Sequence, residues 1–143
     1  VGQSAAPLFL DRIDIQCEIT PVPFKDISKA APGEPSANIR ERVIKAREIQ
    51  AARYKDYKGI HCNAQMTERM IHQFAEPNEA GIDMLRMAME KLSLSARAYS
   101  RILKVARTIA DLEGCEHVEL HHLAEAIGYR ALDRGDWAER GHI

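Results

Sequence analysis

A cation near the start of a predicted helix is the first candidate for chemistry in this sequence. Ser95 has the side chain of a helix N-cap, which makes Arg97 the second residue of that helix. The helix dipole is positive there, so acids rather than cations are favoured at this position. Two interpretations follow. Arg97 is either a solvated arginine whose stem covers apolar surface, or part of an anion site suited to a phosphate.

Further cations follow Arg97 on the same predicted helix. Arg101 and Lys104 come four and seven residues later on the same face, and Arg107 lies just beside that face. Residues 95–110 hold four cations and no acid. Such a face is usually only solvated, but it is also the kind of surface that contacts nucleic acid or a neighbouring subunit.

Arg12 is another candidate, in the motif L-D-R-I-D-I. It stands between Asp11 and Asp14, which indicates an exposed arginine paired with a neighbouring carboxylate. Such pairs contribute about 0–1 kcal/mol. The residues alone therefore give Arg12 no chemical role.

A group of potential zinc ligands lies near the C-terminal end, at Cys115, His117, His121 and His122. Their spacing matches no common closed zinc site. Adjacent helical residues point in different directions, so His121 and His122 are not expected to converge. We therefore predict no metal site, and no nucleophile elbow or paired base indicates a hydrolase.

Helices must position most of these residues. The apolar periodicity predicts helices over residues 36–57, 67–74, 77–92, 95–113 and 119–132. Ser36 is the expected N-cap of the first, whose apolar stripe runs through Ile39, Val43 and Ala46. Its other face is basic, because residues 36–58 hold seven Lys or Arg against three acids.

One strand is also predicted, over residues 13–20, where Ile13, Ile15, Cys17 and Ile19 alternate with polar residues. Pro21 and Pro23 then end the pattern. A single strand cannot pair its edges, so we expect it to be the last strand of a sheet whose other members lie outside this chain. The predicted fold class is mainly α, with one remnant N-terminal β-strand.

The composition is that of one compact domain. The chain has 143 residues, of which 45% are hydrophobic and 29% are charged. With 20 Lys and Arg against 21 Asp and Glu, the net charge is -1. This balance excludes a disordered charged tail and a histone-like polycation, although local basic faces remain compatible with it.

Missing signals exclude further classes. No apolar run approaches the ~20 residues that span a bilayer, and no signal peptide pattern is present. The three cysteines are scattered and odd in number, which favours a reducing cytosol over a disulfide scaffold. We therefore expect a cytoplasmic protein without a membrane partner. No G-x-x-x-x-G-K-[ST] phosphate loop is present, so we expect no nucleotide hydrolysis by this chain alone.

The motifs resemble the C-terminal part of the magnesium-chelatase-like AAA+ ATPases, in particular the bacterial ComM/YifB branch. The matching stretches are F-L-D-R-I-D-I-Q-C-E-I, V-P-F, A-P-G-E-P-S-A-N-I-R-E-R-V, C-N-A-Q-M, S-A-R-A-Y-S-R-I-L-K-V-A-R-T-I-A-D-L-E-G and H-L-A-E-A-I-G-Y-R. They cover residues 8–134, whereas residues 1–7 match poorly and the C-terminal tail lies beyond the similarity. The S-A-R-A-Y block is the most specific of them.

The resemblance implies that the chain is part of an ATPase. The phosphate loop, the Walker B acid and sensor 1 of this family lie upstream of the L-D-R-I-D segment. The implied organisation is the end of the AAA+ core over residues 1–22, a helical lid over residues 23–134 and a tail over residues 135–143. ATP and Mg²⁺ are then cofactors of the whole protein, and the fragment alone is expected to hold neither.

The resemblance also implies residue roles. Arg12 is in the place of the arginine finger, which reaches ATP bound in the neighbouring subunit. Arg97 is in the place of the sensor 2 arginine, which contacts the phosphates of ATP in its own subunit, with Ser95 beside it at the nucleotide. These roles suit a planar cation, because the charge on the transferring γ-phosphoryl must be neutralised.

The function implied for the whole protein is that of a ring ATPase, hexameric in this family. The ComM-like branch resembles DNA motors linked to branch migration in natural transformation, and the S-A-R-A-Y and V-P-F segments favour this branch. One alternative is a non-catalytic helical module that binds nucleic acid or a protein partner through its basic faces. A second alternative is a magnesium chelatase subunit of tetrapyrrole synthesis.

Overall fold

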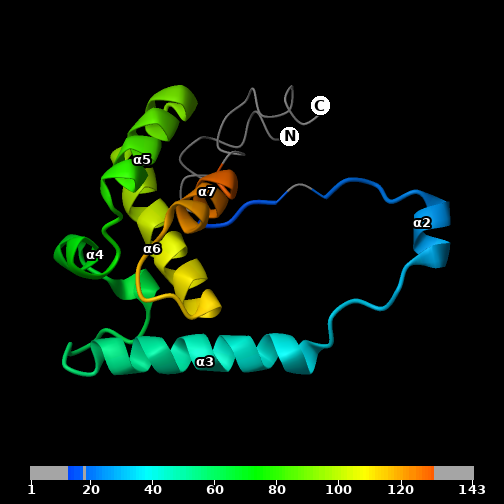
Figure 1. Ribbon diagram of the computed structural model, residues 1–143, viewed down its shortest axis with the longest axis horizontal. Helices are drawn as coiled ribbons and strands as arrows, with labels where there is room; N and C mark the ends of the chain where they lie inside the picture. Colours follow the sequence, from blue (N-terminus) through cyan, green and yellow to red (C-terminus); the bar gives the residue numbers. More distant parts are fainter. Residues whose placement is uncertain (1–12, 18, 131–143) are drawn as a thin grey trace.

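The computed structural model describes residues 13–17 and 19–130, and in this part of the chain all regular elements are helical. In chain order these are α2 (Phe24–Lys29), α3 (Ser36–Tyr54), the 3-10 turn η1 (Asn63–Gln65), α4 (Glu68–Phe74), α5 (Glu79–Leu92), α6 (Ala96–Glu113) and α7 (Leu120–Gly128). Figure 1 shows their arrangement. The predicted mainly α fold class is confirmed. Within the described ranges, no helix has the length and apolar character needed to cross a membrane.

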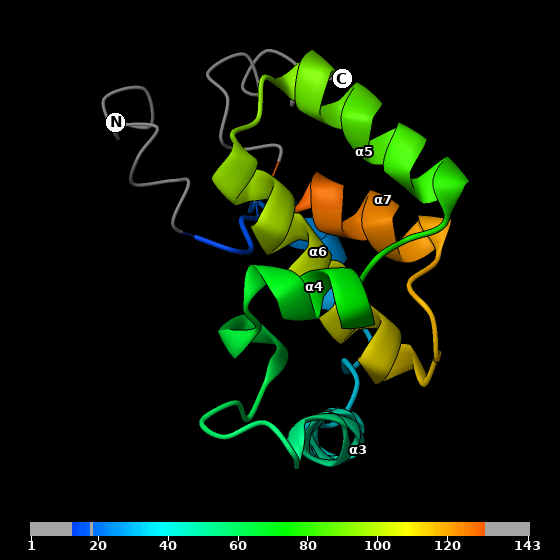
Figure 2. The same cartoon turned by 90° about the vertical axis from the view of Figure 1, so that its left-hand side faces the viewer.

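Helix α6 is the centre of the fold. It contacts α3, η1, α4 and α7, and α7 in turn packs on α5; Figure 2 shows α6 and α7 behind α4 and below α5. Ile102, Leu103 and Ala106 of α6 are buried together with Leu85 of α5 and Leu123 of α7. Burying one such large apolar side chain stabilises a fold by roughly 1.5–3 kcal/mol. The packing around α6 therefore supplies most of the apolar core.

Local side chains fix several helix ends. The side chains of Thr67, Asn78 and Ser95 each accept a hydrogen bond from the backbone N–H three residues later. Gly114 ends α6 in the left-handed conformation, with φ of 78°. The predicted ends at Thr67, Ser95 and Gly114 are confirmed. The predicted start of α5 at Pro77 is wrong, because Asn78 is the N-cap of α5 and Pro77 precedes the helix.

A glycine allows α5 to lie close to α7. A Cβ atom added to Gly81 would be 2.6 Å from Cβ of Pro77 and 2.8 Å from Cδ1 of Leu123. Both distances are shorter than real contacts of Cβ atoms. A glycine within a helix lowers helix propensity, but the packing of these two helices requires Gly81.

A buried polar network joins the end of α3 to α6. The Arg53 guanidinium donates to both carboxylate oxygens of Asp111, at 2.9 and 2.6 Å. The Asn63 side chain donates to Asp111 at 2.9 Å and accepts from the Tyr54 hydroxyl at 2.6 Å. Gln50 accepts the backbone N–H of Asn63 at 3.0 Å. Polar groups that satisfy one another in this way fix one arrangement of the two helices.

The first half of α3, together with α2, extends away from this core (Figure 1). Ser36 is the first residue of α3 and Pro35 occupies the cap position without a side-chain cap, so the predicted Ser36 cap is wrong. Of the predicted stripe, Ala46 is buried, whereas Ile39 and Val43 are 43% and 39% exposed. Helix α2, which no sequence pattern predicted, has no buried residue.

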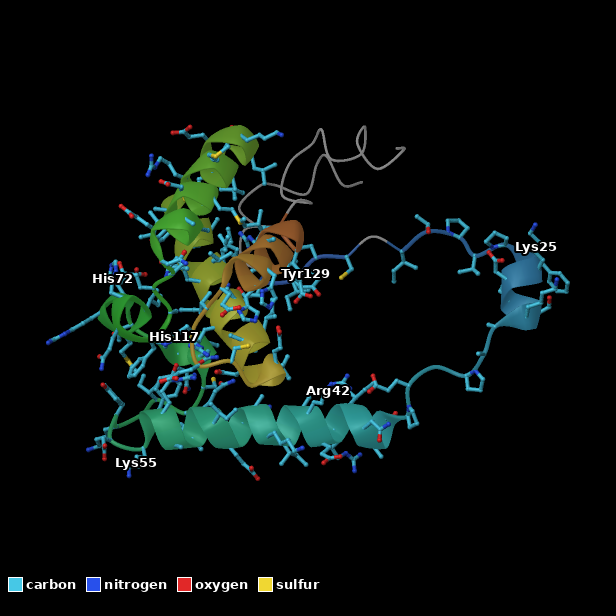
Figure 3. All side chains as sticks on the ribbon, in the orientation of Figure 1. Lys25, Arg42, Lys55, His72, His117 and Tyr129 are labelled. Atoms are coloured by element: carbon cyan, nitrogen blue, oxygen red, sulfur yellow. The ribbon has the colours of Figure 1, made fainter. Side chains whose placement is uncertain are left out.

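The predicted strand over residues 13–20 does not form among the described residues. Ile15 and Ile19, on its predicted apolar face, are 52% and 91% exposed, whereas Gln16 is buried. A strand needs a neighbour for its backbone groups, and the described residues contain no second strand with which it could pair. Instead, the Gln16 N–H donates to the carbonyl of Tyr129 at 3.0 Å. Figure 3 shows Tyr129 where this segment passes the end of α7.

The apolar spacing in residues 119–132 predicts an inner face made of Leu120, Leu123, Ala124 and Ile127, and this prediction is partly wrong. Leu123 is buried as expected, but Leu120 is 40% exposed and Ala124 is also exposed. His122 and Ala126 are buried in their place. The buried face is therefore rotated relative to the apolar stripe, because His122 has polar partners inside the fold.

Candidate functional site

A pocket of about 740 Å³ lies at the start of α6. Its wall includes three cations of α6, namely Arg97, Arg101 and Lys104. Two acids from elsewhere in the chain, Asp14 and Glu68, also line it. The predicted cationic face of α6 therefore borders a hollow large enough for a small polyanion, which makes this pocket the candidate site.

Arg97 lines this pocket, and Ser95 fixes its place at the start of α6. The Ser95 hydroxyl accepts from the backbone N–H of Ala98 at 3.2 Å, which makes Arg97 the second helical residue, as predicted. Its side chain is exposed. The positive end of the helix and the guanidinium thus face the same hollow, and together they favour an anion.

Arg101 and Lys104 continue the cationic wall, and both contact other parts of the chain. Arg101 forms an ion pair with Asp14, 87 residues earlier in the sequence. The Lys104 ammonium donates to the carbonyl of Ala64 at 3.2 Å. These contacts hold both cations against the pocket, while each remains partly exposed.

Glu68 at the start of α4 forms another side of the pocket. Its carboxylate accepts from the Ser100 hydroxyl, at 2.7 and 3.0 Å from the two oxygens. The sequence pattern did not indicate Glu68 or Asp14 as site residues. Only the packing of α4 and of the N-terminal segment on α6 brings them to the pocket.

Arg107 does not share this face, which corrects the prediction that it contacts nucleic acid or a subunit. Only 2% of Arg107 is exposed. Its guanidinium donates to the carbonyls of Cys115 and Glu116, at 2.7 and 2.8 Å, and to that of Phe74 at 3.3 Å. It also pairs with Asp111 at 3.1 Å. The pKa of Arg107 is lowered, chiefly because the guanidinium is buried. Arg107 therefore stabilises α6 and the loop that follows it, and it does not belong to an exposed surface.

Arg12, the predicted arginine finger, lies outside the described residues. The residues that follow it are held on the end of α7: the Arg130 guanidinium donates to the carbonyl of Ile13 at 2.5 Å. Arg130 is fully buried. The backbone just after Arg12 is therefore attached to the residues that follow α7 and lies beside the pocket that Asp14 lines.

The histidine group has a different arrangement from the one predicted. His121 and His122 both contact the carboxylate of Glu113, through Nε2 at 3.0 Å and 2.8 Å respectively. The prediction that they do not converge is wrong, because Glu113 at the end of α6 reaches the first turn of α7. These hydrogen bonds hold the pKa of Glu113 below its ordinary value, and the contact with His121 has the larger effect.

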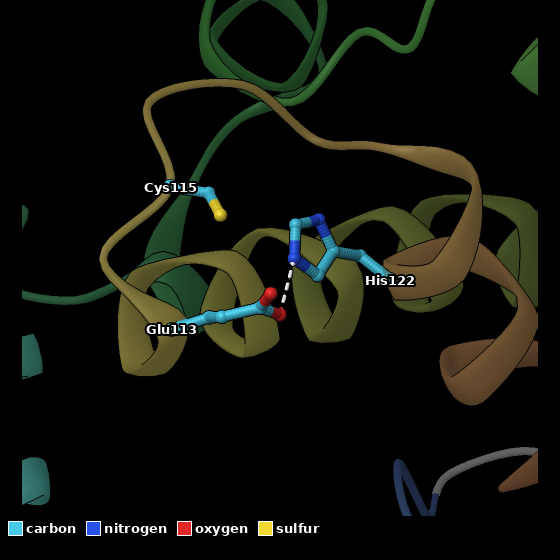
Figure 4. Close-up of side chains that lie close together, drawn as sticks. All are labelled: Glu113, Cys115 and His122. Carbon is cyan, nitrogen blue, oxygen red and sulfur yellow. Dashed lines mark hydrogen bonds and ion pairs between the residues drawn. The ribbon is translucent and has the colours of Figure 1, made fainter.

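Three possible metal-ligand atoms, from Glu113, Cys115 and His122, lie within 4.8 Å of one another (Figure 4). Nδ1 of His122 accepts the backbone N–H of Glu119 at 2.9 Å, so its proton must be on Nε2, facing Glu113. A metal ion bound to Nε2 would displace that proton, and the neutral ring would then carry its proton on Nδ1. Nδ1 could no longer accept the hydrogen bond from the backbone N–H of Glu119. Hydrogen bonds at the start of α7 therefore account for the position of His122 beside Glu113.

The pKa of the Cys115 thiol is raised, chiefly because the thiol is partly buried.

Comparison with known proteins covers most of the described chain. Residues 33–130 match the family described as "Magnesium chelatase, subunit ChlI C-terminal". The chain is 43% identical over 127 residues to "Competence protein ComM" of Haemophilus influenzae and 41% identical to "Uncharacterized protein YifB" of Escherichia coli. Both matches cover 88% of this chain and 24% of the relative. A protein of Mycobacterium bovis, "Uncharacterized protein Mb2921c", is 32% identical over 130 residues. The chain spans about a quarter of the length of these curated relatives.

Proposed function

This chain belongs to the family of the magnesium chelatase ChlI C-terminal domain, and from that premise we propose that it is the helical lid of an AAA+ ATPase. Its fold and its similarity to ComM and YifB support a lid-like domain of a chelatase-related protein. The observation that carries the proposal is the pocket at the start of α6, with Arg97, Arg101 and Lys104 in its wall. A nucleoside triphosphate is the anion that such a lid covers.

In the proposed mechanism, Arg97 neutralises charge on the phosphates of ATP bound in its own subunit. The guanidinium is planar and permanently charged, and the adjacent helix start adds a positive potential. Arg12 acts on ATP bound in the neighbouring subunit of a ring. When bound, Mg²⁺ and ATP supply the transferring group and its counter-charge, while this chain contributes cations and covers the nucleotide.

The test of this function is Arg97→Ala in the full-length protein. ATP hydrolysis per subunit should fall on the order of 10²-fold, as for the loss of one preorganised donor at a developing charge. Arg86→Ala is the matched control, because Arg86 is an exposed arginine of α5 that pairs with Asp83. Equal ATPase rates for Arg97→Ala and the control would refute the proposed role of Arg97.

We further propose that the whole protein is a DNA-associated motor, on the basis of its similarity to "Competence protein ComM" and of its basic helix α3. Arg40 and Arg47 are exposed on α3, and Lys55 is exposed directly after its last residue. Figure 3 shows Lys55 at this end of the helix and Arg42 on its first half. Phosphate contacts by such cations release counterions, so DNA binding should weaken steeply with salt. Salt-independent DNA binding, or none in the full-length protein, would count against this role and leave the lid role intact.

A further inference from the structure

We propose that Asp14 is an internal anion of the α6 pocket, which competes with bound phosphate for Arg101 and so couples phosphate binding to the N-terminal segment. This inference rests on the proposed lid function and adds a positioning residue to it. Asp14 and Arg101 form an ion pair when no phosphate is bound. When phosphate binds, it replaces the Asp14 carboxylate on Arg101.

The contact lies inside the candidate site. Asp14 Oδ1 pairs with a terminal nitrogen of the Arg101 guanidinium, and both residues line the pocket together with Arg97 and Lys104. Arg101 follows Arg97 by one helical turn, so both guanidinium groups lie on the same face of α6. A phosphate held by Arg97 is therefore also within the electrostatic reach of Arg101.

The pair is suited to exchange rather than to permanent structure. The side chain of Asp14 is 48% exposed and that of Arg101 is 29% exposed. Ion pairs with this much solvent contact are weak. A polyphosphate carries several negative charges, and arginine binds it with two parallel hydrogen bonds, whereas Asp14 offers one charge. Phosphate in the pocket thus replaces the Asp14 carboxylate on Arg101.

The exchange acts on a segment that is otherwise attached to α7. Arg130 donates to the carbonyl of Ile13, and the Gln16 N–H donates to the carbonyl of Tyr129. These two contacts remain when Asp14 is released, so the segment keeps its place on α7 while its link to the pocket is lost. Arg12, proposed to act on the neighbouring subunit, comes two residues before Asp14. Phosphate bound in the pocket of one subunit is thereby linked to the segment that bears Arg12, which is proposed to act on the nucleotide of the neighbouring subunit.

The second pocket acid offers a comparison inside the same site. Glu68 accepts from the Ser100 hydroxyl rather than lying on a guanidinium in the contacts described above. Its removal changes the charge of the pocket by the same amount as removal of the Asp14 charge. A specific effect of Asp14 is thus separable from a general effect of negative charge.

The experiment measures binding of inorganic tripolyphosphate to the 143-residue chain at low salt by titration calorimetry. Asp14→Asn should tighten binding about tenfold, because the Asp14 carboxylate no longer competes with phosphate for Arg101. Glu68→Gln should tighten it less, and Asp83→Asn, which alters an exposed pair on α5, should leave it unchanged. In an Arg101→Gln background, Asp14→Asn should have no effect, since the contact is already lost.

Amide spectra of the same samples report the coupling directly. Tripolyphosphate should shift the amide of Ile15, the residue next to the released Asp14, in the unsubstituted chain and should shift it less in Asp14→Asn. Equal affinities of the unsubstituted and Asp14→Asn chains, with binding still weakened by Arg97→Ala, would overturn this inference and leave the lid function standing. Binding that Arg97→Ala does not weaken would instead overturn the lid function itself.

Discussion

The Arg53 guanidinium and the Asp111 carboxylate join α3 to α6 through two hydrogen bonds, at 2.9 and 2.6 Å, across 58 residues of sequence. The Asp111 side chain is fully buried and that of Arg53 is 13% exposed. Asp111 also pairs with the buried Arg107. One carboxylate therefore pairs with two guanidinium groups, and the position of α3 depends on it.

Asp111→Asn should destabilise the chain by about 3–5 kcal/mol, because it leaves two arginines without their buried counter-charge. The measurement is the free energy of unfolding from urea titration followed by circular dichroism. Asp83→Asn removes an exposed carboxylate of α5 and should change the stability by less than about 1 kcal/mol. A similar small effect for Asp111→Asn would show that the network contributes little.

Gly81→Ala should destabilise the chain although alanine is the better helix former. The new methyl group meets Pro77 and Leu123 at 2.6 and 2.8 Å, and overpacking of this kind costs about 1–3 kcal/mol. Gly128→Ala is the matched control, because Gly128 lies in α7 with no atom within 4 Å of an added Cβ. The control should be neutral or stabilising by up to about 1 kcal/mol. Equal stability of the two variants would contradict the close contact of α5 and α7.

Glu113 should make stability depend on pH at the acidic end. Its pKa is lowered in the folded chain, chiefly by the hydrogen bonds from His121 and His122, so the folded state favours its ionised form. Its contribution is fully present above the ordinary pKa of 4.5 and is lost as the pH falls through the lower, folded value. Urea midpoints between pH 6 and pH 3 should fall less steeply for Glu113→Gln than for the unsubstituted chain.

The control for this titration is Glu90→Gln, which removes an exposed carboxylate of α5. Its urea midpoints should follow those of the unsubstituted chain at each pH. If the urea midpoint of Glu113→Gln falls with pH as steeply as those of Glu90→Gln and the unsubstituted chain, the contacts of Glu113 with the two histidines do not stabilise the folded state.

The sequence predicted the helix ends best, because their signals are local. A side-chain cap at Thr67 or Ser95 needs only the backbone N–H three residues later, and the left-handed turn at Gly114 needs only a glycine. For the same reason the relation of Arg97 to the start of α6 was predictable. The cap predicted at Ser36 failed because Pro35 already sets the conformation that begins α3.

Contacts between distant segments were beyond the reach of the sequence pattern. Arg107 lies beside the cationic face by spacing, but its acceptors are carbonyls from the end of α4 and from the loop after α6. Asp14 meets Arg101 only because the N-terminal segment is held on α7. No periodicity encodes either meeting, since both depend on how whole helices pack.

The proposed division of labour between Arg12 and Arg97 predicts complementation between two inactive variants. In full-length rings, Arg12→Ala should lower ATP hydrolysis on the order of 10³-fold or more, the usual loss for an arginine finger. Arg97→Ala should be defective at its own nucleotide. When the two variants are mixed in equal amounts, some Arg12→Ala subunits lie beside Arg97→Ala subunits. The nucleotide of the former then has its own Arg97 and the partner's intact finger.

In a randomly mixed ring, about a quarter of the interfaces combine an intact Arg97 with an intact Arg12 from the neighbour. The mixture should therefore recover about a quarter of the unsubstituted ATPase rate if interfaces act independently. If both arginines served the same nucleotide within one subunit, no mixed ring would contain an intact site. A mixture no more active than the two separate variants would therefore refute action of Arg12 on the neighbouring subunit, provided that size-exclusion chromatography shows mixed rings.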